Sequence, residues 1–303
     1  MMSKILITGG AGFIGSNLAE FLLDKGLDVV ILDNFSTGSR ENIERIKDKI
    51  EVLELDVRDI EGLRKNLKDI DYIFHLAAFV SVPESVKKRC ETFEINVKGT
   101  KNILEIAKEI GAKKVIIPSS AAVYGDDPEL PKTEDSKLMP LSPYAESKIQ
   151  KERLVKEFSK DIETAALRLF NVYGPNQNPA SPYAAVIPIF IKKALEGKDL
   201  IIYGDGEQTR DFIYIKDVCE AFLSAINTKL NGDIINIASG KELSINELAK
   251  KIIELTNSKS KVVYSRPREG DIIRSVAGID LSKEKLNFEP KYSLDTGLKE
   301  IIN

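Results

Sequence analysis

The sequence lacks tryptophan and contains one histidine and two cysteines in 303 residues. The cysteines, Cys90 and Cys219, lie far apart in helical segments with no neighbouring base, which argues against a disulfide framework and indicates a reducing compartment. The histidine, His75, ends an apolar run and has no partners at ligand spacing. We therefore expect packing roles for the cysteines, a structural role for His75 and no metal site.

Long hydrophobic runs and blocks of one charge sign are also missing. No stretch approaches the ~20 apolar residues of a membrane span, and the N-terminal apolar run is too short for a signal peptide. The 44 basic and 47 acidic residues are spread along the chain and give a net charge of −3, which favours neither nucleic acid nor an anionic membrane as a partner. We therefore expect a cytoplasmic globular protein with no membrane and no nucleic-acid partner.

A glycine-rich segment directly follows the first strand-like run. Residues 4–8 are apolar and β-branched, residues 9–15 read Gly-Gly-Ala-Gly-Phe-Ile-Gly, and Ile14, Leu18 and Leu22 follow at helical spacing. In a dinucleotide-binding turn, glycines permit a tight turn and close approach of a pyrophosphate, and the helix N-terminus faces the anion. A glycine-rich turn without a ligand is the alternative interpretation.

The acid after the second strand-like run argues against that alternative. Residues 28–32 are again apolar, and Asp33 follows 18 residues beyond Gly15. This spacing is near the ~20 residues expected for a carboxylate that binds the adenosine ribose hydroxyls. A carboxylate would repel the 2′-phosphate of NADP, and no arginine stands directly beside Asp33, so the pattern predicts NAD.

Strand and helix patterns alternate through the first 170 residues. Further strand-like runs are 51–55, 72–76, 114–118 and 164–169, and helical segments lie around 40–48, 60–68, 92–110 and 144–159. The alternation predicts an α/β fold with a Rossmann-type doubly wound parallel sheet, in which ligands bind at the carboxyl ends of the strands.

The pattern changes beyond residue 170. A turn-rich stretch at 171–179 precedes a helix at 187–195 and a strand at 200–203, whereas the helix at 216–227 and the strand at 234–237 return to the first domain. We expect an NAD-binding domain of residues 1–170 with a returning segment at about 212–238. Residues 171–211 and 239–303 would form a smaller mixed α/β substrate-binding domain, with the site in the cleft between the two.

Residues 142–148 predict a helix start with Tyr144 and Lys148 one turn apart on one face. A phenol has a reference pKa of about 10, which a nearby ammonium lowers, giving a base for hydroxyl deprotonation. With nine tyrosines in a lysine-rich chain the spacing alone can arise by chance. The pair Ser119 and Ser120 strengthens the interpretation, because a serine hydroxyl could share the substrate oxygen with Tyr144.

These segments, with Asp56, residues 75–78 and Asn96, resemble the extended short-chain dehydrogenase/reductase superfamily. The segments 168–174, 206–212 and 267–271 narrow the resemblance to nucleotide-sugar 4-epimerases, over nearly the whole chain. The resemblance implies interconversion of UDP-glucose and UDP-galactose by transient oxidation at C4 with permanently bound NAD and no net redox. Tyr144 would take the proton of the sugar 4-hydroxyl, Ser120 would hydrogen-bond that oxygen, and Lys148 would hold the nicotinamide ribose and tune Tyr144.

The resemblance also implies two sets of binding residues. The cofactor would contact Gly9, Gly12, Phe13, Ile14, Gly15, Asp33, Asn34, Asp56, Val57, Leu76, Ala77, Ala78, Asn96, Ser119, Tyr144, Lys148 and Phe170. The substrate would contact Ser81, Ser120, Tyr144, Asn171, Val186, Tyr203, Arg210, Arg268, Asp271 and Ser275. Arg210 and Arg268 would bind the diphosphate because each guanidinium can contact two oxygens, with structural or surface salt bridges as the alternative.

Departures from related families bear on the reaction. Sugar dehydratases of this superfamily carry an Asp-Glu pair where this chain has Ala121 and Ala122, and decarboxylases carry a glutamate at the second position. Methyl groups cannot act as acid or base, which argues against both reactions. Ser275 stands where a large aromatic residue would restrict the pocket to hexoses, so we expect tolerance of UDP-N-acetylhexosamines, although Val80 and Ala121 depart from that branch.

A net oxidoreductase and an NAD sensor are the alternative functions, and a homodimer is the expected assembly. A dehydrogenase or reductase with net redox would consume exchangeable cofactor, and an NAD sensor would need no base such as Tyr144. By resemblance the helices at 92–110 and 144–159 would pair with a second subunit in a four-helix bundle, and we expect apolar stripes on their outer faces. Without the resemblance, they read as helices that only cover the sheet.

Overall fold

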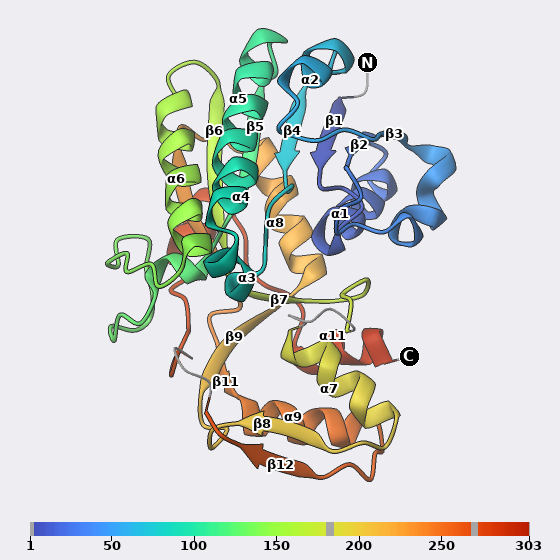
Figure 1. The fold of residues 1–303 in the computed structure, drawn as a ribbon, viewed down its shortest axis with the longest axis vertical. Helices are drawn as coiled ribbons and strands as arrows, with labels where there is room; N and C mark the ends of the chain where they lie inside the picture. Colours follow the sequence, from blue (N-terminus) through green and yellow to red (C-terminus); the bar gives the residue numbers. More distant parts are fainter. Residues whose placement is uncertain (1–2, 180–184, 268–271, 303) are drawn as a thin grey trace.

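The computed structural model describes residues 3–179, 185–267 and 272–302, and its centre is a seven-stranded parallel sheet (Figure 1). The strand order is β10-β6-β5-β4-β1-β2-β3. The strands are β1 Lys4–Thr8, β2 Asp28–Leu32, β3 Glu51–Leu53, β4 Tyr72–His75, β5 Lys114–Ser120, β6 Glu163–Leu169 and β10 Asp233–Ile237. The order reverses between β1 and β4, where ligands bind in open α/β sheets. The predicted Rossmann-type fold is confirmed.

Alternate residues of each strand enter two separate cores. Ile5 and Ile7 of β1 pack toward α1 and α8, whereas Leu6 between them packs toward α2, α5 and α6. The helices of this part are α1 Phe13–Asp24, the 3-10 helix η1 Arg40–Lys49, α2 Ile60–Asn66, α5 Gly99–Glu109, α6 Pro143–Phe158 and α8 Ile215–Asn227. Burial of both faces explains why the strands read as continuous apolar runs.

The single helix expected over 92–110 is divided. The chain forms α3 Val82–Lys87 and α4 Arg89–Phe93, then a π-helical turn, η2 Glu94–Lys98, before α5 begins. Asn96 lies in this wide turn and is fully buried, with its side chain fastened to the loop after β4. Single π-turns inside helices often accompany functional sites.

The C-terminal elements lie below the large sheet in Figure 1 and are joined to it by β7 and β9. They form a three-stranded sheet of β11-β9-β7 and a parallel pair of β12 and β8. The strands are β7 Asn171–Tyr173, β8 Leu200–Tyr203, β9 Thr209–Tyr214, β11 Glu242–Ser244 and β12 Val262–Ser265, and the helices are α7 Val186–Leu195, α9 Ile245–Leu255, α10 Asp280–Leu286 and α11 Leu294–Ile302. One hydrophobic cluster includes residues of both parts, so they pack together.

The apolar stripes expected on the outer faces of the helices at 92–110 and 144–159 stay a prediction, because several large apolar residues there, such as Ile95 and Ile149, are only half-buried. In these two fully described ranges every large apolar side chain is buried or half-buried. The exposed outer positions are charged, for example Lys101 and Lys108 on α5 and Arg153 and Lys156 on α6. Among the residues that the structure describes, no helix combines the length and apolar character needed to cross a membrane.

Candidate active site

The glycine turn after β1 has no room for side chains. Gly9 has φ +68°, and a Cβ there would lie 2.7 Å from the backbone nitrogen of Ala77. A Cβ on Gly15 would lie 2.3 Å from the carbonyl oxygen of Gly9. Gly12 is the N-cap of α1 and no side chain caps that helix, so side chains leave its first N–H groups free for a ligand. A dinucleotide pyrophosphate fits this combination of a tight turn and an uncapped helix N-terminus.

Asp33 is built into the same turn. Its carboxylate accepts hydrogen bonds from the backbone nitrogens of Ala11, at 2.9 Å, and Phe35, at 2.8 Å. The residue is only 7% exposed, and this burial raises the pKa of the carboxyl although both hydrogen bonds oppose the rise. A carboxylate has about four acceptor positions, so two remain for ribose hydroxyls.

Asp56 and Asn34, which were predicted separately, are in contact. Asn34 donates to Asp56 Oδ2 at 2.8 Å, and Arg58 donates to both carboxylate oxygens from Nε and Nη2 at 2.9 and 2.7 Å. The guanidinium is the largest influence on Asp56 and lowers the pKa of that carboxyl to about 2. Sequence reasoning missed Arg58, because a basic residue two positions from an acid in a turn looks like an ordinary surface residue.

His75 links the glycine turn to Asn96 through hydroxyl groups, which confirms its structural role. Its Nδ1 lies 2.7 Å from Thr8 Oγ1 and its Nε2 lies 2.9 Å from Thr100 Oγ1. Since the Thr100 hydroxyl donates to the Asn96 carbonyl, we assign the ring proton to Nε2. Complete burial lowers the pKa of His75 well below its ordinary value, so the ring is neutral.

The backbone of Tyr144 is fixed on both sides. Its N–H donates to Ser85 Oγ of α3 at 3.1 Å, and its carbonyl accepts from Ser147 Oγ at 2.7 Å. Asn96 donates to the same Ser147 hydroxyl at 2.9 Å and also binds the backbone of Phe79 in the loop after β4. The roles of Ser85 and Ser147 depend on contacts between distant segments, and nothing in the sequence pattern indicated them.

The predicted catalytic residues lie at the start of α6 and the end of β5, which pack together. Ser142 caps α6 by accepting from the Ala145 N–H at 3.2 Å, with Pro143 as the first helical residue. Lys148 is 3% exposed, donates to the Pro118 carbonyl of β5 at 3.2 Å, and lies with Nζ 5.3 Å from the centre of the Tyr144 ring. Ser120 is the last residue of β5 and is half-buried.

The structure also places the remaining cofactor candidates. Phe13 and Ile14 begin α1, Leu76 and Ala77 pass beside the glycine turn, and Ala78 follows them. Val57 and Phe170 are both 4% exposed and belong to hydrophobic cores. The Ser119 hydroxyl donates to Glu152 at 2.6 Å, so a cofactor contact at Ser119 would have to use other atoms of the residue.

Several of the residues predicted to bind the substrate lie around β9. Asn171 donates to the Asp211 carbonyl at 3.0 Å, and Arg210 donates to the carbonyls of Thr209 and Ile272 at 2.8 and 2.6 Å. Ser275 follows Ile272 on the segment beside β9 and is half-buried. The other candidates occupy separate elements, with Ser81 capping α3, Val186 starting α7 and Tyr203 ending β8. Arg268 and Asp271 lie outside the described residues.

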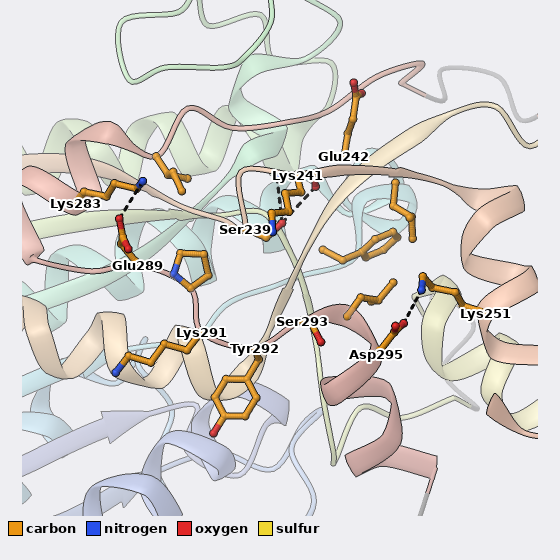
Figure 2. A pocket seen from close by; sticks show the side chains of 15 residues that line it. Ser239, Lys241, Glu242, Lys251, Lys283, Glu289, Lys291, Tyr292, Ser293 and Asp295 are labelled. Carbon is orange, nitrogen blue, oxygen red and sulfur yellow. Dashed lines mark hydrogen bonds and ion pairs between the residues drawn. The ribbon is translucent and has the colours of Figure 1, made fainter. Parts of the chain in front are cut away.

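A cavity of about 550 Å³ lies elsewhere, between β9, β11 and the helices α9 to α11 (Figure 2). Its charged side chains include the pairs Lys283–Glu289, at 3.0 Å, and Lys251–Asp295, at 2.6 Å. None of the predicted catalytic, cofactor or substrate residues lines it. It is therefore separate from the candidate active site.

Comparisons with known proteins place this arrangement in a family. Residues 5–238 match the model of the NAD dependent epimerase/dehydratase family. The chain is 42% identical to a putative UDP-glucose 4-epimerase of Methanocaldococcus jannaschii, with 99% of this chain and 97% of that protein covered. It is also 39% identical to a UDP-N-acetyl-alpha-D-glucosaminuronate decarboxylase of Bacillus cytotoxicus, with 100% and 97% covered.

The solved structures agree. A UDP-N-acetylglucosamine 4-epimerase of Methanobrevibacter ruminantium, in complex with UDP-N-acetylmuramic acid, superposes with a TM-score of 0.94 at 40% identity and covers 100% of this chain and 98% of its own. The relatives include both epimerases and a decarboxylase, so they identify the family rather than one reaction. This chain belongs to the NAD-dependent epimerase/dehydratase family of nucleotide-sugar enzymes.

Proposed function

We propose that this chain is a UDP-sugar 4-epimerase that interconverts UDP-glucose and UDP-galactose and also accepts UDP-N-acetylhexosamines. The observation that carries the proposal is the composition of the site itself. Tyr144 and Lys148 lie at the start of α6 and Ser120 ends β5, which packs against α6, while Ala121 and Ala122 begin the 3-10 turn that follows β5. The site therefore has a base for the 4-hydroxyl and no carboxylate in this turn for elimination or decarboxylation.

Each residue would have a defined task. Tyr144 would take the proton of the sugar 4-hydroxyl and return it to the same oxygen, and Ser120 would hydrogen-bond that oxygen. Lys148, whose Nζ lies 5.3 Å from the centre of the Tyr144 ring, would hold the nicotinamide ribose. NAD, held by the glycine turn and Asp33, would supply the acceptor for the hydride at C4 of the sugar. Return of the hydride to the other face of C4 would give the opposite configuration.

The substrate would extend from this centre toward β9. Asn171 and Arg210 would bind its diphosphate, and we propose the same for Arg268, with Asp271 on the ribose. Val186 and Tyr203 would contact the uracil, and Ser81 would lie near the sugar. The small side chain of Ser275 leaves room for a 2-acetamido group, and the epimerase from M. ruminantium is named for such a sugar.

Turnover without added cofactor tests the proposal. The purified chain should convert UDP-glucose to UDP-galactose, and UDP-N-acetylglucosamine to its 4-epimer, with no lasting change in absorbance at 340 nm. Stoichiometric formation of reduced cofactor would instead indicate a net oxidoreductase, and release of CO₂ from UDP-glucuronate would indicate a decarboxylase. Complete inactivity on the acetylated pair alone would contradict the role of Ser275.

Tyr144→Phe separates catalysis from binding. Loss of a general base is expected to lower kcat by about 10²- to 10⁴-fold. Bound NAD should remain, because the glycine turn and Asp33 are unchanged. Unimpaired turnover would show that Tyr144 is not the base.

The assembly and location of the chain are also proposals. A homodimer through the faces of α5 and α6 would form a four-helix bundle across exposed charged positions such as Lys101 and Arg153, with half-buried residues such as Ile95 and Ile149 adding apolar contact. Light scattering would show a mass of two chains if the proposal holds. We propose a cytoplasmic location, which fractionation of the source cells would test.

A further inference from the structure

A buried ion pair joins the catalytic helix to the neighbouring strands. Arg168 of β6 donates from Nε and Nη2 to the two carboxylate oxygens of Glu152, both at 2.8 Å. Ser119 of β5 donates to Glu152 Oε1 at 2.6 Å. The Arg168 and Glu152 side chains are 3% and 4% exposed, so this contact is shielded from water.

The remaining donor of Arg168 completes the network. Nη1 donates to the Tyr124 hydroxyl at 2.9 Å and to the Glu134 carbonyl at 3.1 Å. Tyr124 in turn donates to Asn236 Oδ1 of β10 at 2.6 Å. Burial raises the pKa of Tyr124 to about 12, so its hydroxyl keeps the proton that it donates. The network thus ties β5, β6, β10 and α6 into one unit.

Its position matters because the catalytic groups come from two of these elements. Ser120 belongs to β5 and is adjacent to Ser119, whereas Tyr144 and Lys148 belong to α6, and Glu152 lies one turn beyond Lys148. The proposed reaction requires the hydroxyls of Ser120 and Tyr144 to meet at one substrate oxygen. Hydrogen bonds across the junction hold β5 against α6 at Lys148–Pro118 and at Glu152–Ser119.

We propose that Glu152, held by Arg168, is a positioning residue for catalysis that sets the Ser120 hydroxyl relative to Tyr144 through its hydrogen bond with Ser119. This inference rests on the proposed epimerase function and adds residues that take no part in binding substrate. Misplacement of a catalytic group by about 1 Å can lower a rate by about 10²-fold, so a single hydrogen bond at this junction can control turnover.

Ser119→Ala is the sharpest test because it removes one donor and leaves the Arg168–Glu152 pair intact. We expect kcat for UDP-glucose to fall by about 10- to 100-fold, with KM and bound NAD nearly unchanged. Ser119→Thr restores a hydroxyl and should recover most of the turnover. Ser282→Ala is the matched control: Ser282 is fully buried in α10, donates to the Ile279 carbonyl at 2.8 Å, and should not affect kcat.

A double-mutant cycle distinguishes positioning from general weakening of the fold. In a Ser120→Ala background, Ser119→Ala should change kcat by less than about twofold, because the group it positions is already absent. An equal loss in both backgrounds, or no loss in the native background, would overturn the inference while leaving the proposed function intact. An unmodified chain without epimerase turnover would overturn both.

Discussion

Two adjacent residues of α6, Glu152 and Lys151, show two different outcomes of burying an ionisable group. Glu152 faces Arg168 and Ser119 and has partners on both oxygens. Lys151 is fully buried, and its Nζ has no hydrogen-bond partner among the described residues. Lys148 on the same helix lowers the pKa of Lys151, and Lys151 in turn contributes to the lowered pKa of His75 in β4.

The difference lies in what faces each side chain. Burial, and secondarily the charge of Lys148, lowers the pKa of Lys151 well below its ordinary value. The Glu152 carboxylate instead contacts Arg168 at two points. Helix α6 therefore carries a fully paired charge at Glu152 next to a buried amine without a hydrogen-bond partner at Lys151.

The largest change in stability is expected when the Arg168–Glu152 ion pair is broken. Arg168→Met leaves the Glu152 carboxylate buried without its cation, and we expect a loss of about 3–5 kcal/mol in the free energy of unfolding. The double variant Arg168→Met with Glu152→Leu removes both charges and should be clearly more stable than the single one. Urea unfolding measures both, and equal losses would show that the pair is not electrostatically coupled.

Replacing Lys151, which has no hydrogen-bond partner, is expected to raise the free energy of unfolding. Lys151→Met removes a buried polar atom without a partner and keeps the length of the side chain. We expect a gain of about 1–3 kcal/mol in unfolding free energy near neutral pH. Lys156→Met, at an exposed position of the same helix, is the control and should have little effect. A Lys151→Met variant less stable than the parent would mean that the amine has a partner in solution.

The pH dependence sharpens this prediction. Lys151 ordinarily titrates near 10.5, and its folded-state pKa is lower, so between the two values the unfolded chain binds a proton that the folded chain does not. Stability therefore rises with pH by up to about 1.4 kcal/mol per unit in that window. The advantage of Lys151→Met over the parent should shrink as pH approaches about 10. A difference independent of pH would contradict the lowered pKa of Lys151.

The smallest change in stability is expected at the Asp56–Arg58 ion pair, because water screens these partly exposed charges. The folded-state pKa of Asp56, about 2, lies below its ordinary 3.8, so its stabilising effect is present above about 4 and is lost as pH falls toward 2. Because both side chains are partly exposed, Asp56→Asn should reduce unfolding free energy at pH 7 by less than about 1 kcal/mol. Acid titration of both proteins by circular dichroism should show their stabilities converging below pH 3.

The sequence predicted those features that depend on short segments. The strand-turn-helix of residues 4–24, the acid at Asp33 and the Tyr144–Lys148 spacing are local patterns, and each one restricts the backbone directly. The parallel sheet followed from the alternation of strand and helix patterns, whereas the order of its strands is known only from the structure. The active-site assignments remain predictions that the proposed experiments would test.

Features that depend on distant partners were not predictable. Lys151 and Glu152 are two ionisable residues in a helix with many acidic and basic side chains. Only the contacts of this helix with β4, β5 and β6 determine which of the two has a partner. The π-turn at Asn96 exists because that side chain fastens the backbone of Phe79 and the hydroxyl of Ser147, residues 17 and 51 positions away. The apolar stripes expected on the outer faces of the two helices stay a prediction, since they depend on a second subunit.

The most direct measurement follows a deuterium label at C4 of UDP-glucose through turnover without added cofactor. If Tyr144 and bound NAD act as proposed, the UDP-galactose formed keeps the deuterium at C4, because the hydride that leaves this carbon returns to it. Loss of the label to solvent, or accumulation of a 4-keto sugar with reduced cofactor, would contradict the account.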